Sequence, residues 1–541
     1  MSTKTAVLTV QDLDHCGIVA GIIDQMGLVE QINRVLGVHP QQKVSAGVVV
    51  KAMIINGLGF VSAPLYLFEQ FFVGKATEHL LGEGVKPEHL NDDRLGRVLD
   101  QLYQTGVTSL FVQLALVAAA RLGVKQEWMH LDSSSFHVHG EYLSKEGTVT
   151  EELGAIRITH GYSREHRPDL KQFIVDLMCS GDGEVPLYLR VGSGNESDQA
   201  TFVERIKEFR EQWQSDAVFV ADTALYSSTN IQAMTEMQWL TRAPATIKEA
   251  QELMETIAEE GFEAAETPGY RYSSVCSMYG GVKQRWLVVE SEARRKSDLK
   301  QLDKKVQQQL EATQKKLKKL SKKTFACAPD AEAAARQFNQ ELRYHCLEQI
   351  KVIAQANSAK ARRAPLEEIS QSGHYCLEGT LVVNPEVIEQ ETRKAGRFIL
   401  ATNILDSQFL CEQGMLDQYK EQQGAERGFR FLKEPLFFTS SVFLKTPERI
   451  EALAMVMGLS LLVYTLAQRT LRQALATSQQ TVKNQLGKPS ATPTMRWVFQ
   501  CFQSIHLVII NGNRQIVNLT AVHQDILGFL GAPCQKYYLL V

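Results

Sequence analysis

Four polar side chains recur along one predicted helix, in the segment YKEQQGAERGFRFLK at 419–433. Tyr419, Gln422, Glu426 and Lys433 are spaced at i, i+3, i+7 and i+14. At ~100° per residue they point to roughly 0°, 300°, 340° and 320° around the axis, which makes one stripe. The carboxylate can bind a metal ion, and the hydroxyl, amide and amine can hold phosphate oxygens. The stripe therefore indicates chemistry on a phosphate ester.

Two aspartates earlier in the chain are candidates for the same site as Glu426. Asp132 lies within the predicted strand of EWMHLDSSSFHVHGEY, and Asp222 ends the apolar run of DAVFVADTALYS. A hard ion such as Mg²⁺ takes oxygen ligands and keeps waters, so two or three carboxylates from separate elements suffice to bind it. Two such ions about 3.5 to 4 Å apart can activate an attacking oxygen and stabilise a leaving oxygen in an in-line phosphoryl displacement.

Each of these signals also has a plainer explanation. An isolated aspartate at a strand end is more often a turn or cap residue. A stripe that contains Glu and Lys is usually a solvated face or a set of intrahelical ion pairs. An aspartate inside an apolar strand, in contrast, is costly unless its charge is used or paired. The inference therefore depends on the order of the three acidic residues along the chain.

That order resembles the DDE transposases of bacterial insertion sequences, in the group with the motif Y-x2-R-x3-E-x6-K (YREK). The motif stands here as Tyr419, Gln422, Glu426 and Lys433, after two strand-borne aspartates and a long insertion. The segments YSREHRPDLKQF and GSGNESD resemble those that link the first and second aspartates in that group. The resemblance covers roughly residues 126–480.

The resemblance implies an α/β fold, with an RNase H-like mixed-sheet core, a β-containing insertion domain and a helical N-terminal domain. It implies two Mg²⁺ or Mn²⁺ ions held by Asp132, Asp222 and Glu426, and Tyr419, Gln422 and Lys433 on the DNA phosphates. The activity implied is cleavage at transposon ends followed by transfer of the freed 3′-OH into target DNA. The implied partners are terminal inverted repeats and target DNA, with a homodimer on paired ends.

One motif position departs from the pattern. Gln422 stands where the motif has arginine, and an amide can donate hydrogen bonds to a phosphate but brings no charge. Arg427 and Arg430 are near in sequence, and Arg430 points to roughly 20° on the same wheel. We expect Arg430 to compensate as a DNA-binding residue.

Changes in residue pattern along the chain divide it into five segments. We expect a helical N-terminal domain suited to recognising DNA ends (1–125), a first core segment (126–240), an insertion domain (241–394), a second core segment (395–480) and a C-terminal unit that is a candidate for oligomerisation (481–541).

The insertion contains two features that suggest contact with DNA. In relatives of this type, an aromatic side chain on a β-hairpin stacks on a DNA base that has flipped out of the duplex. Trp286 is the candidate for this role, because it lies on a predicted hairpin with Gly280-Gly281 at its turn. Its alternative role is packing in the core of the insertion.

The second feature is a run of positive charge. Residues 294–323 hold twelve Lys/Arg against three Asp/Glu, which could neutralise phosphates or form a solvated helix face. Three histidines lie near Asp132 in sequence, and we expect them to have a local structural role: His130, His137 and His139.

The composition of the chain argues against several classes of protein. The 541 residues carry 58 basic against 61 acidic side chains, so any nucleic-acid surface must be local. Nine scattered cysteines show no zinc spacing and indicate a reducing compartment. The apolar runs at 110–120 and 452–467 fall short of the ~18 to 20 residues of a membrane span, and we expect buried helices there, with no membrane partner. The N-terminus has no secretion signal, which predicts a cytoplasmic protein. The resemblance to bacterial transposases implies that it is associated with the nucleoid.

Two other classes of function stay open. The first is a nuclease with the same core that hydrolyses DNA without strand transfer. The second is a catalytically inactive DNA-binding protein whose carboxylates do not converge.

Overall fold

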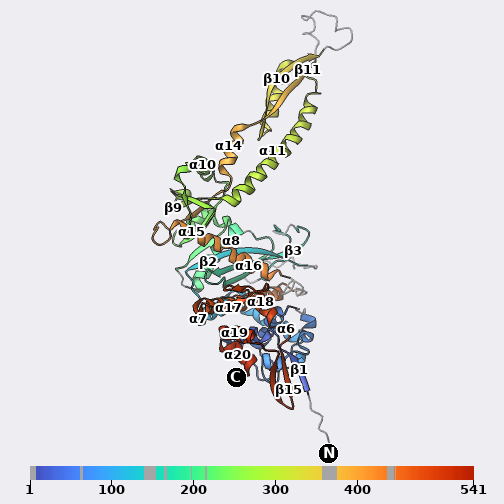
Figure 1. The fold of residues 1–541 in the computed structure, drawn as a ribbon. Coiled ribbons are helices and arrows are strands. Elements are labelled where there is room, and N and C mark those ends of the chain that lie inside the picture. The colour runs from blue at the N-terminus through green and yellow to red at the C-terminus, as the bar shows by residue number, and fades with distance from the viewer. Residues whose placement is uncertain are drawn as a thin grey trace, which may run out of the picture.

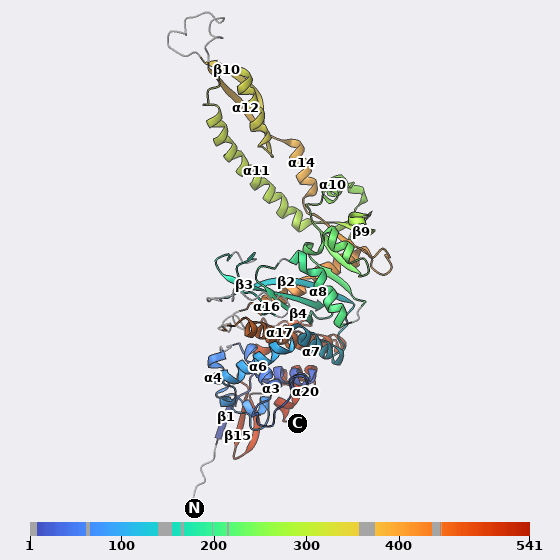
Figure 2. The ribbon, with the colours of Figure 1, turned by 180° about the vertical axis from the view of Figure 1, so that it is seen from behind.

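The computed structural model shows an elongated molecule with a helical base, a central sheet and a projecting arm (Figure 1). It describes residues 8–60, 65–138, 154–163, 167–196, 198–213, 216–355, 374–434, 444 and 446–540. The sheet lies between the base and the arm in both views (Figures 1 and 2).

The first 125 residues are mainly helical, as their apolar periodicity predicts. The apolar sides of these helices are buried in one large core that extends into the central sheet. The elements of the base are β1 (Leu8–Asp12), α1 (Cys16–Met26), α2 (Leu28–Leu36), α3 (Ala46–Gly57), η1 (Leu65–Leu67), α4 (Phe68–Phe72), α5 (Thr77–Leu81), η2 (Pro87–His89), α6 (Asp92–Thr105) and α7 (Val107–Arg121).

The C-terminal unit packs on these N-terminal helices. Its elements are β13 (Val482–Lys483), β14 (Pro489–Ser490), α18 (Met495–Cys501), β15 (His506–Ile510), β16 (Asn513–Val517), α19 (Ala521–Leu530) and α20 (Ala532–Leu539). Strand β15 pairs antiparallel with β1, and α20 lies against α1. A polar cluster ties the two segments together: Lys51 Nζ lies 2.7 Å from Asp24 Oδ1, and the Tyr537 hydroxyl donates to Asp24 Oδ2 at 2.6 Å. The two ends of the chain thus form one structural layer, and a role of this unit in oligomerisation stays a prediction.

His15 is buried where these two segments meet. Its Nε2 donates to the carbonyl of Leu58 at 2.8 Å, and Gln503 donates to its Nδ1 at 2.9 Å, so the ring is held as the neutral tautomer. Burial lowers the pKa of His15 from 6.5 to about 4; the Leu58 carbonyl opposes this and nearby Lys75 adds to it.

We expect acid to destabilise the protein through His15. The unfolded chain takes up a proton at this residue near pH 6.5, but the folded protein resists it until about pH 4, so stability present above 6.5 is lost as the pH falls through that window. The thermal unfolding midpoint, measured from pH 7 to pH 4, should fall less steeply in His15→Gln than in the wild type. The exposed His39→Gln should keep the wild-type slope, and equal slopes in all three proteins would refute the assignment.

The central sheet has nine strands in the order β4-β3-β2-β5-β6-β12-β9-β8-β7. Strands β2, β3 and β4 are antiparallel neighbours, β5 and β6 run parallel to β2, and the rest pair antiparallel. The strands are β2 (Trp128–Val138), β3 (Lys171–Ser180), β4 (Pro186–Ser193), β5 (Val218–Ala221), β6 (Trp239–Ala243), β7 (Glu263–Ala264), β8 (Tyr270–Ser277), β9 (Gln284–Ser291) and β12 (Arg397–Thr402). The elements between them are α8 (Asp198–Gln212), η3 (Thr223–Leu225), α9 (Ser228–Ala233), α10 (Lys248–Thr256), η4 (Glu259–Gly261) and η5 (Tyr279–Gly281). The expected mixed α/β sheet is present.

The predicted hairpin around Gly280-Gly281 is present as β8 and β9, and both glycines have positive φ. It does not stand apart from the core as an insertion would. Strand β9 pairs with β12, and β12 pairs with β6, so the hairpin extends the central sheet. Fully buried β9 lies inside the sheet, whereas β8 is only partly covered.

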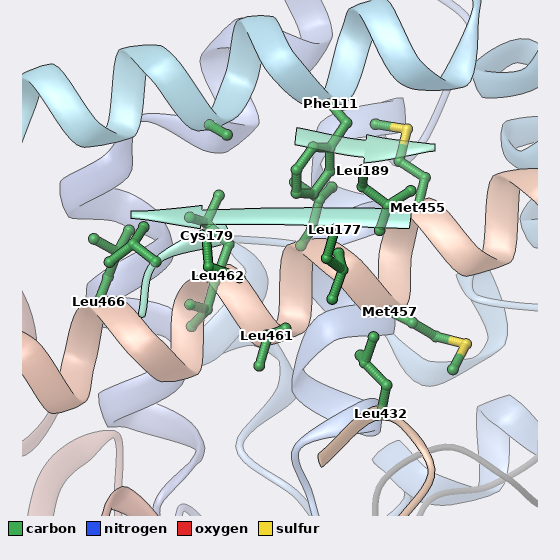
Figure 3. Packing of buried hydrophobic residues seen from close by; sticks show 14 of the residues in the cluster. Phe111, Leu177, Cys179, Leu189, Leu432, Met455, Met457, Leu461, Leu462 and Leu466 are labelled. Atoms are coloured by element: carbon green, nitrogen blue, oxygen red, sulfur yellow. The ribbon is translucent and has the colours of Figure 1, made fainter. Parts of the chain in front are cut away.

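Helix α17 (Pro447–Ser478) runs through the core between the base and the sheet. Its side chains meet Phe111 of α7, Leu177 of β3 and Leu189 of β4 (Figure 3). A Cβ on Gly458 would lie 2.3 Å from Leu189 Cδ1, so a glycine is needed for this close approach. By length and composition α17 could cross a membrane, as could the bent pair α6–α7 taken together, but 89% of the most apolar α17 window is buried inside the protein. The runs at 110–120 and 452–467 are buried helices, as predicted.

The projecting arm contains residues 292–355 and 374–394. It contains α11 (Glu292–Leu320), α12 (Ala328–Gln340), β10 (His345–Gln355), β11 (His374–Val383) and α14 (Pro385–Lys394). Strands β10 and β11 form their own two-stranded sheet, and the arm has a small separate core. Figure 2 shows α11 running from the central sheet to the far end of the arm.

Candidate functional site

Asp132 and Asp222 are positioned by two adjacent parallel strands. The register pairs Trp128 with Val218 and His130 with Val220, and its continuation by two residues sets Asp132 beside Asp222. Neighbouring strands lie about 4.8 Å apart, so the two carboxylates come from neighbouring backbones at the same level of the sheet. Each is half-buried. Residues ninety apart in sequence thus meet at one edge.

Backbone groups hold one oxygen of each aspartate. Asp132 Oδ1 accepts from the N–H of Ser133 at 2.8 Å. Asp222 Oδ1 accepts from the N–H of Ala224 at 2.9 Å, which caps the short helix η3. Thr241 on the next strand donates to the carbonyl of Asp222 at 2.6 Å. Each aspartate thus has one carboxylate oxygen oriented by a neighbouring backbone N–H.

The polar stripe lies on α15 (Glu412–Glu421) and α16 (Gln423–Leu432), which meet at Gln422. One continuous helix was expected, but a turn at Gln422 separates the two. Gln422 keeps right-handed helical angles (φ −53°, ψ −23°), so the chain continues in nearly the same direction and the stripe persists.

The apolar sides of these helices explain the orientation of the stripe. In α15, Met415 and Leu416 pack in a core cluster with Val220 and Leu400 of the sheet. In α16, Ala425, Phe429 and Leu432 pack in the main core. Burial of these faces turns the polar side toward the ends of β2 and β5.

All three acids and all four stripe positions line one open cavity of about 630 Å³. Its lining residues are Asp132, Ser133, Ser134, Asp222, Tyr419, Gln422, Glu426, Phe429, Arg430, Lys433 and Glu434. The convergence expected from the sequence is therefore present at the level of the cavity.

The donor set suits a hard cation, because it is three carboxylates at a water-accessible cavity. The carboxylates are not gathered around one point: among the described residues, no three His, Cys, Asp or Glu side chains stand close enough to hold a single ion. Asp132 and Asp222 are fixed on strands, whereas Glu426 is exposed on a helix and has the longer side chain. An ion bound by the two aspartates would thus gain its third carboxylate by movement of Glu426.

Positive side chains complete the cavity on the helical side. Arg430 lines it, is exposed, and makes no ion pair with any residue in the described ranges. Lys433 lies over the Phe136 ring, with Nζ 5.3 Å from the ring centre. Arg427 points elsewhere and pairs with Glu184, its Nε 3.1 Å from Oε2. Of the two arginines near Gln422, only Arg430 can therefore supply the missing charge.

Arg242 on β6 was not anticipated from the sequence. Burial raises the pKa of the Tyr419 phenol, and the guanidinium of Arg242, which hydrogen-bonds that side chain, opposes the rise. Arg242 also lies over Phe398, 5.3 Å from the ring centre. The one feature of the sequence that could have pointed to Arg242 is its place in the short apolar strand QWLTRAP. An arginine at such a position is also typical of ordinary ion pairs.

Trp286 does not present a face for base stacking. It is 2% exposed, and its Nε1 donates to the Tyr226 hydroxyl at 2.8 Å. The ring is enclosed by Tyr226, by Tyr279, whose ring centre lies 6.4 Å away, and by the main core in which it packs. This burial agrees with the alternative role, packing in a core. The core in question is that of the central sheet and not a separate core of the insertion.

The histidines near Asp132 have separate surroundings. His130 is 2% exposed, and burial lowers its pKa to about 4. His137 Nε2 lies 2.9 Å from the Ser163 hydroxyl. His139 lies outside the described residues. Neither His130 nor His137 is among the residues that line the cavity.

Comparisons with known proteins add little to this geometry. The model of DUF4277, a domain of unknown function, matches residues 8–116 and stops before any site residue. A solved cryo-EM structure of a piggyBac transposase synaptic complex with hairpin DNA is 9% identical, with a TM-score of 0.36 over 90% of this chain and 79% of that chain. No curated protein matches. The functional argument therefore depends on the site itself.

Proposed function

We propose that this protein is a metal-dependent DNA transposase that cleaves the ends of a transposable element and transfers the freed 3′-OH into target DNA. The observation that carries the proposal is the cavity in which Asp132, Asp222 and Glu426 meet the stripe of Tyr419, Gln422 and Lys433. Side chains up to about three hundred positions apart share one surface, which a chance stripe on a helix would not produce.

Asp132, Asp222 and Glu426 would hold Mg²⁺ or Mn²⁺, in two ions per site. Such ions, when bound, polarise phosphoryl oxygens and lower the pKa of water at the reacting phosphorus. The stripe has a different task. Tyr419 and Gln422 donate hydrogen bonds to phosphate oxygens, and Lys433 and Arg430 add positive charge at the same wall. These groups orient the strand to be cut.

The partners in this proposal are double-stranded DNA at the terminal inverted repeats and at the target. Coupled strand transfer needs two ends held together, so we propose a homodimer on paired ends, acting in the cytoplasm at the nucleoid. The helical base is the proposed site of end recognition.

A strand-transfer assay tests the proposal against the nuclease alternative. The substrate is pre-cleaved DNA from the natural flanks of the coding sequence, incubated with Mg²⁺ and a supercoiled target plasmid. A transposase joins the 3′-OH ends to the plasmid. A protein that cuts the intact flanks but never joins the pre-cleaved ends is a nuclease, and the proposed function is then wrong.

Arg430→Gln should weaken binding of the cleaved strand by about 10- to 100-fold, the range for losing one hydrogen bond to a charged group. The matched control is Arg427→Gln, which removes the same charge three residues earlier, where Glu184 engages it. The double variant Gln422→Arg/Arg430→Gln should recover part of the loss. Equal effects of both single variants, measured by fluorescence anisotropy in EDTA, would contradict the role of Arg430.

A further inference from the structure

One face of α11 is covered with exposed lysines. They are Lys296, Lys300, Lys304, Lys315, Lys318 and Lys319. At ~100° per residue they occupy a sector of roughly 140° along the whole helix. Over its 29 residues, at 1.5 Å each, the helix is about 43 Å long.

The opposite side of α11 is occupied by the rest of the arm. Leu302 and Thr313 are buried, and Leu317 and Leu320 pack on the small core that includes Phe338 of α12. These four residues point to roughly 240° to 300° on the wheel that puts Lys296 at 0°. The apolar side therefore already has its partner, and the lysine face is the open one.

The charge of this face is not balanced by neighbours. In the part of the chain that the structure describes, none of the six lysines forms an ion pair. Of the acids on the helix, Asp298 turns to Arg294 and to the N–H of Gly396, at the foot of the arm. Glu311 points to roughly 60°, within the lysine face, and accepts a hydrogen bond from Gln307. Asp303 points to roughly 340°, at the edge of the face, so six positive charges stand against two carboxylates. This excess of positive charge suits a polyanion better than a single acidic group.

The N-terminal end of α11 lies near the cavity. The Arg294 guanidinium lies 5.6 Å from the centre of the Phe398 ring, and that ring lies 6.1 Å from the ring of Tyr419, which lines the cavity. Two side-chain contacts therefore link the start of α11 to the wall of the cavity.

We propose that the lysine face of α11 binds the phosphate backbone of the DNA duplex whose strand is held in the cavity. For the identity of the polyanion this rests on the proposed function. Lysines act as point charges on flexible stems, so the contact is independent of base sequence. At 3.4 Å per base pair, the length of the helix corresponds to about 13 base pairs.

The test is the salt dependence of DNA binding, measured in EDTA by fluorescence anisotropy on a duplex from the natural flank. The variant Lys300→Gln/Lys304→Gln/Lys315→Gln/Lys318→Gln removes four charges from the face. Each lost phosphate contact lowers the slope of log K against log salt by about 0.9. We therefore expect a slope about 3.6 units shallower, so that the wild type loses roughly 100-fold more affinity than the variant between 50 and 200 mM salt.

The control variant Lys207→Gln/Lys248→Gln/Lys283→Gln/Lys488→Gln removes the same charge from four exposed lysines scattered over the sheet and the C-terminal unit. Its slope should stay within about one unit of the wild type. Hydroxyl-radical footprinting supplies a second measurement: only the α11 variant should lose protection of phosphates beyond the cleavage site. Both variants should keep the wild-type melting midpoint, because every replaced side chain is exposed.

Equal slopes for the α11 variant and the wild type, with cutting by the wild type intact, would overturn the role of the arm and leave the proposed function standing. Unchanged DNA binding with loss of binding to phosphatidylserine vesicles would make the partner a membrane surface and also refute the proposal. A wild type that neither binds nor cuts DNA would remove the proposed function itself.

Discussion

Asp222→Asn abolishes DNA cleavage and leaves DNA binding intact; this is the largest effect we expect. Loss of an outer partner of a metal ligand typically costs 10- to 100-fold in affinity or activity, so loss of a ligand should cost more than about 100-fold. The amide keeps an acceptor oxygen for the N–H of Ala224, and the local turn survives. Asp132→Asn and Glu426→Gln should behave in the same way.

The measurement is nicking of a plasmid that carries the coding sequence with its natural flanks, in Mg²⁺, in Mn²⁺ and in EDTA. Asp406→Asn is the matched control, because Asp406 also accepts from a backbone N–H two residues on, that of Gln408 at 2.8 Å, but lies in an exposed loop away from the cavity. Wild-type cutting by Asp222→Asn would mean that the three carboxylates do not form the metal site. A wild type that binds DNA without cutting in any metal would identify an inactive DNA-binding protein.

Phe111→Ala should give the largest loss of stability, about 3 to 5 kcal/mol in the free energy of unfolding. Phe111 is fully buried and packs in the cluster that joins α7 and α17 to the edge of the sheet (Figure 3). Its truncation leaves a cavity that the surrounding helices can fill only in part. The urea midpoint of the transition should therefore fall clearly.

The matched control is Phe409→Ala, which removes the same side chain where it is 56% exposed. Its stability should change by no more than about 0.5 kcal/mol. Similar midpoints for the two variants would mean that α7 does not unfold together with the core. DNA cleavage per folded molecule should be unchanged in both, since neither residue lines the cavity.

Periodicity identified much of the secondary structure because local patterns determine it. The helices of the base, the buried runs at 110–120 and 452–467, and the hairpin at Gly280-Gly281 all depend on spacing or turn chemistry within a few residues. The break at Gln422 was not predicted, because no proline stands there and a single glycine two residues on, Gly424, is tolerated inside a helical pattern.

Burial in the sheet depends on neighbours that are distant in sequence. Trp286 has the same local pattern whether its side of the sheet is covered or open, and only the packing of Tyr226 and the main core on the ring decides that it is buried. Arg242 is a similar case, because its contact with Tyr419 joins a strand to a helix more than 170 residues later.

By itself the sequence determined which residues are chemically able to form the site: three carboxylates, and a helical stripe whose spacing puts its members on one side of an axis. The tertiary structure decided which of them meet. Parallel pairing of β2 with β5 sets Asp132 beside Asp222, and burial of the apolar sides of α15 and α16 turns Glu426 toward them. The physical reason is that spacing acts along one element, whereas strand register and helix packing join elements that no local pattern relates.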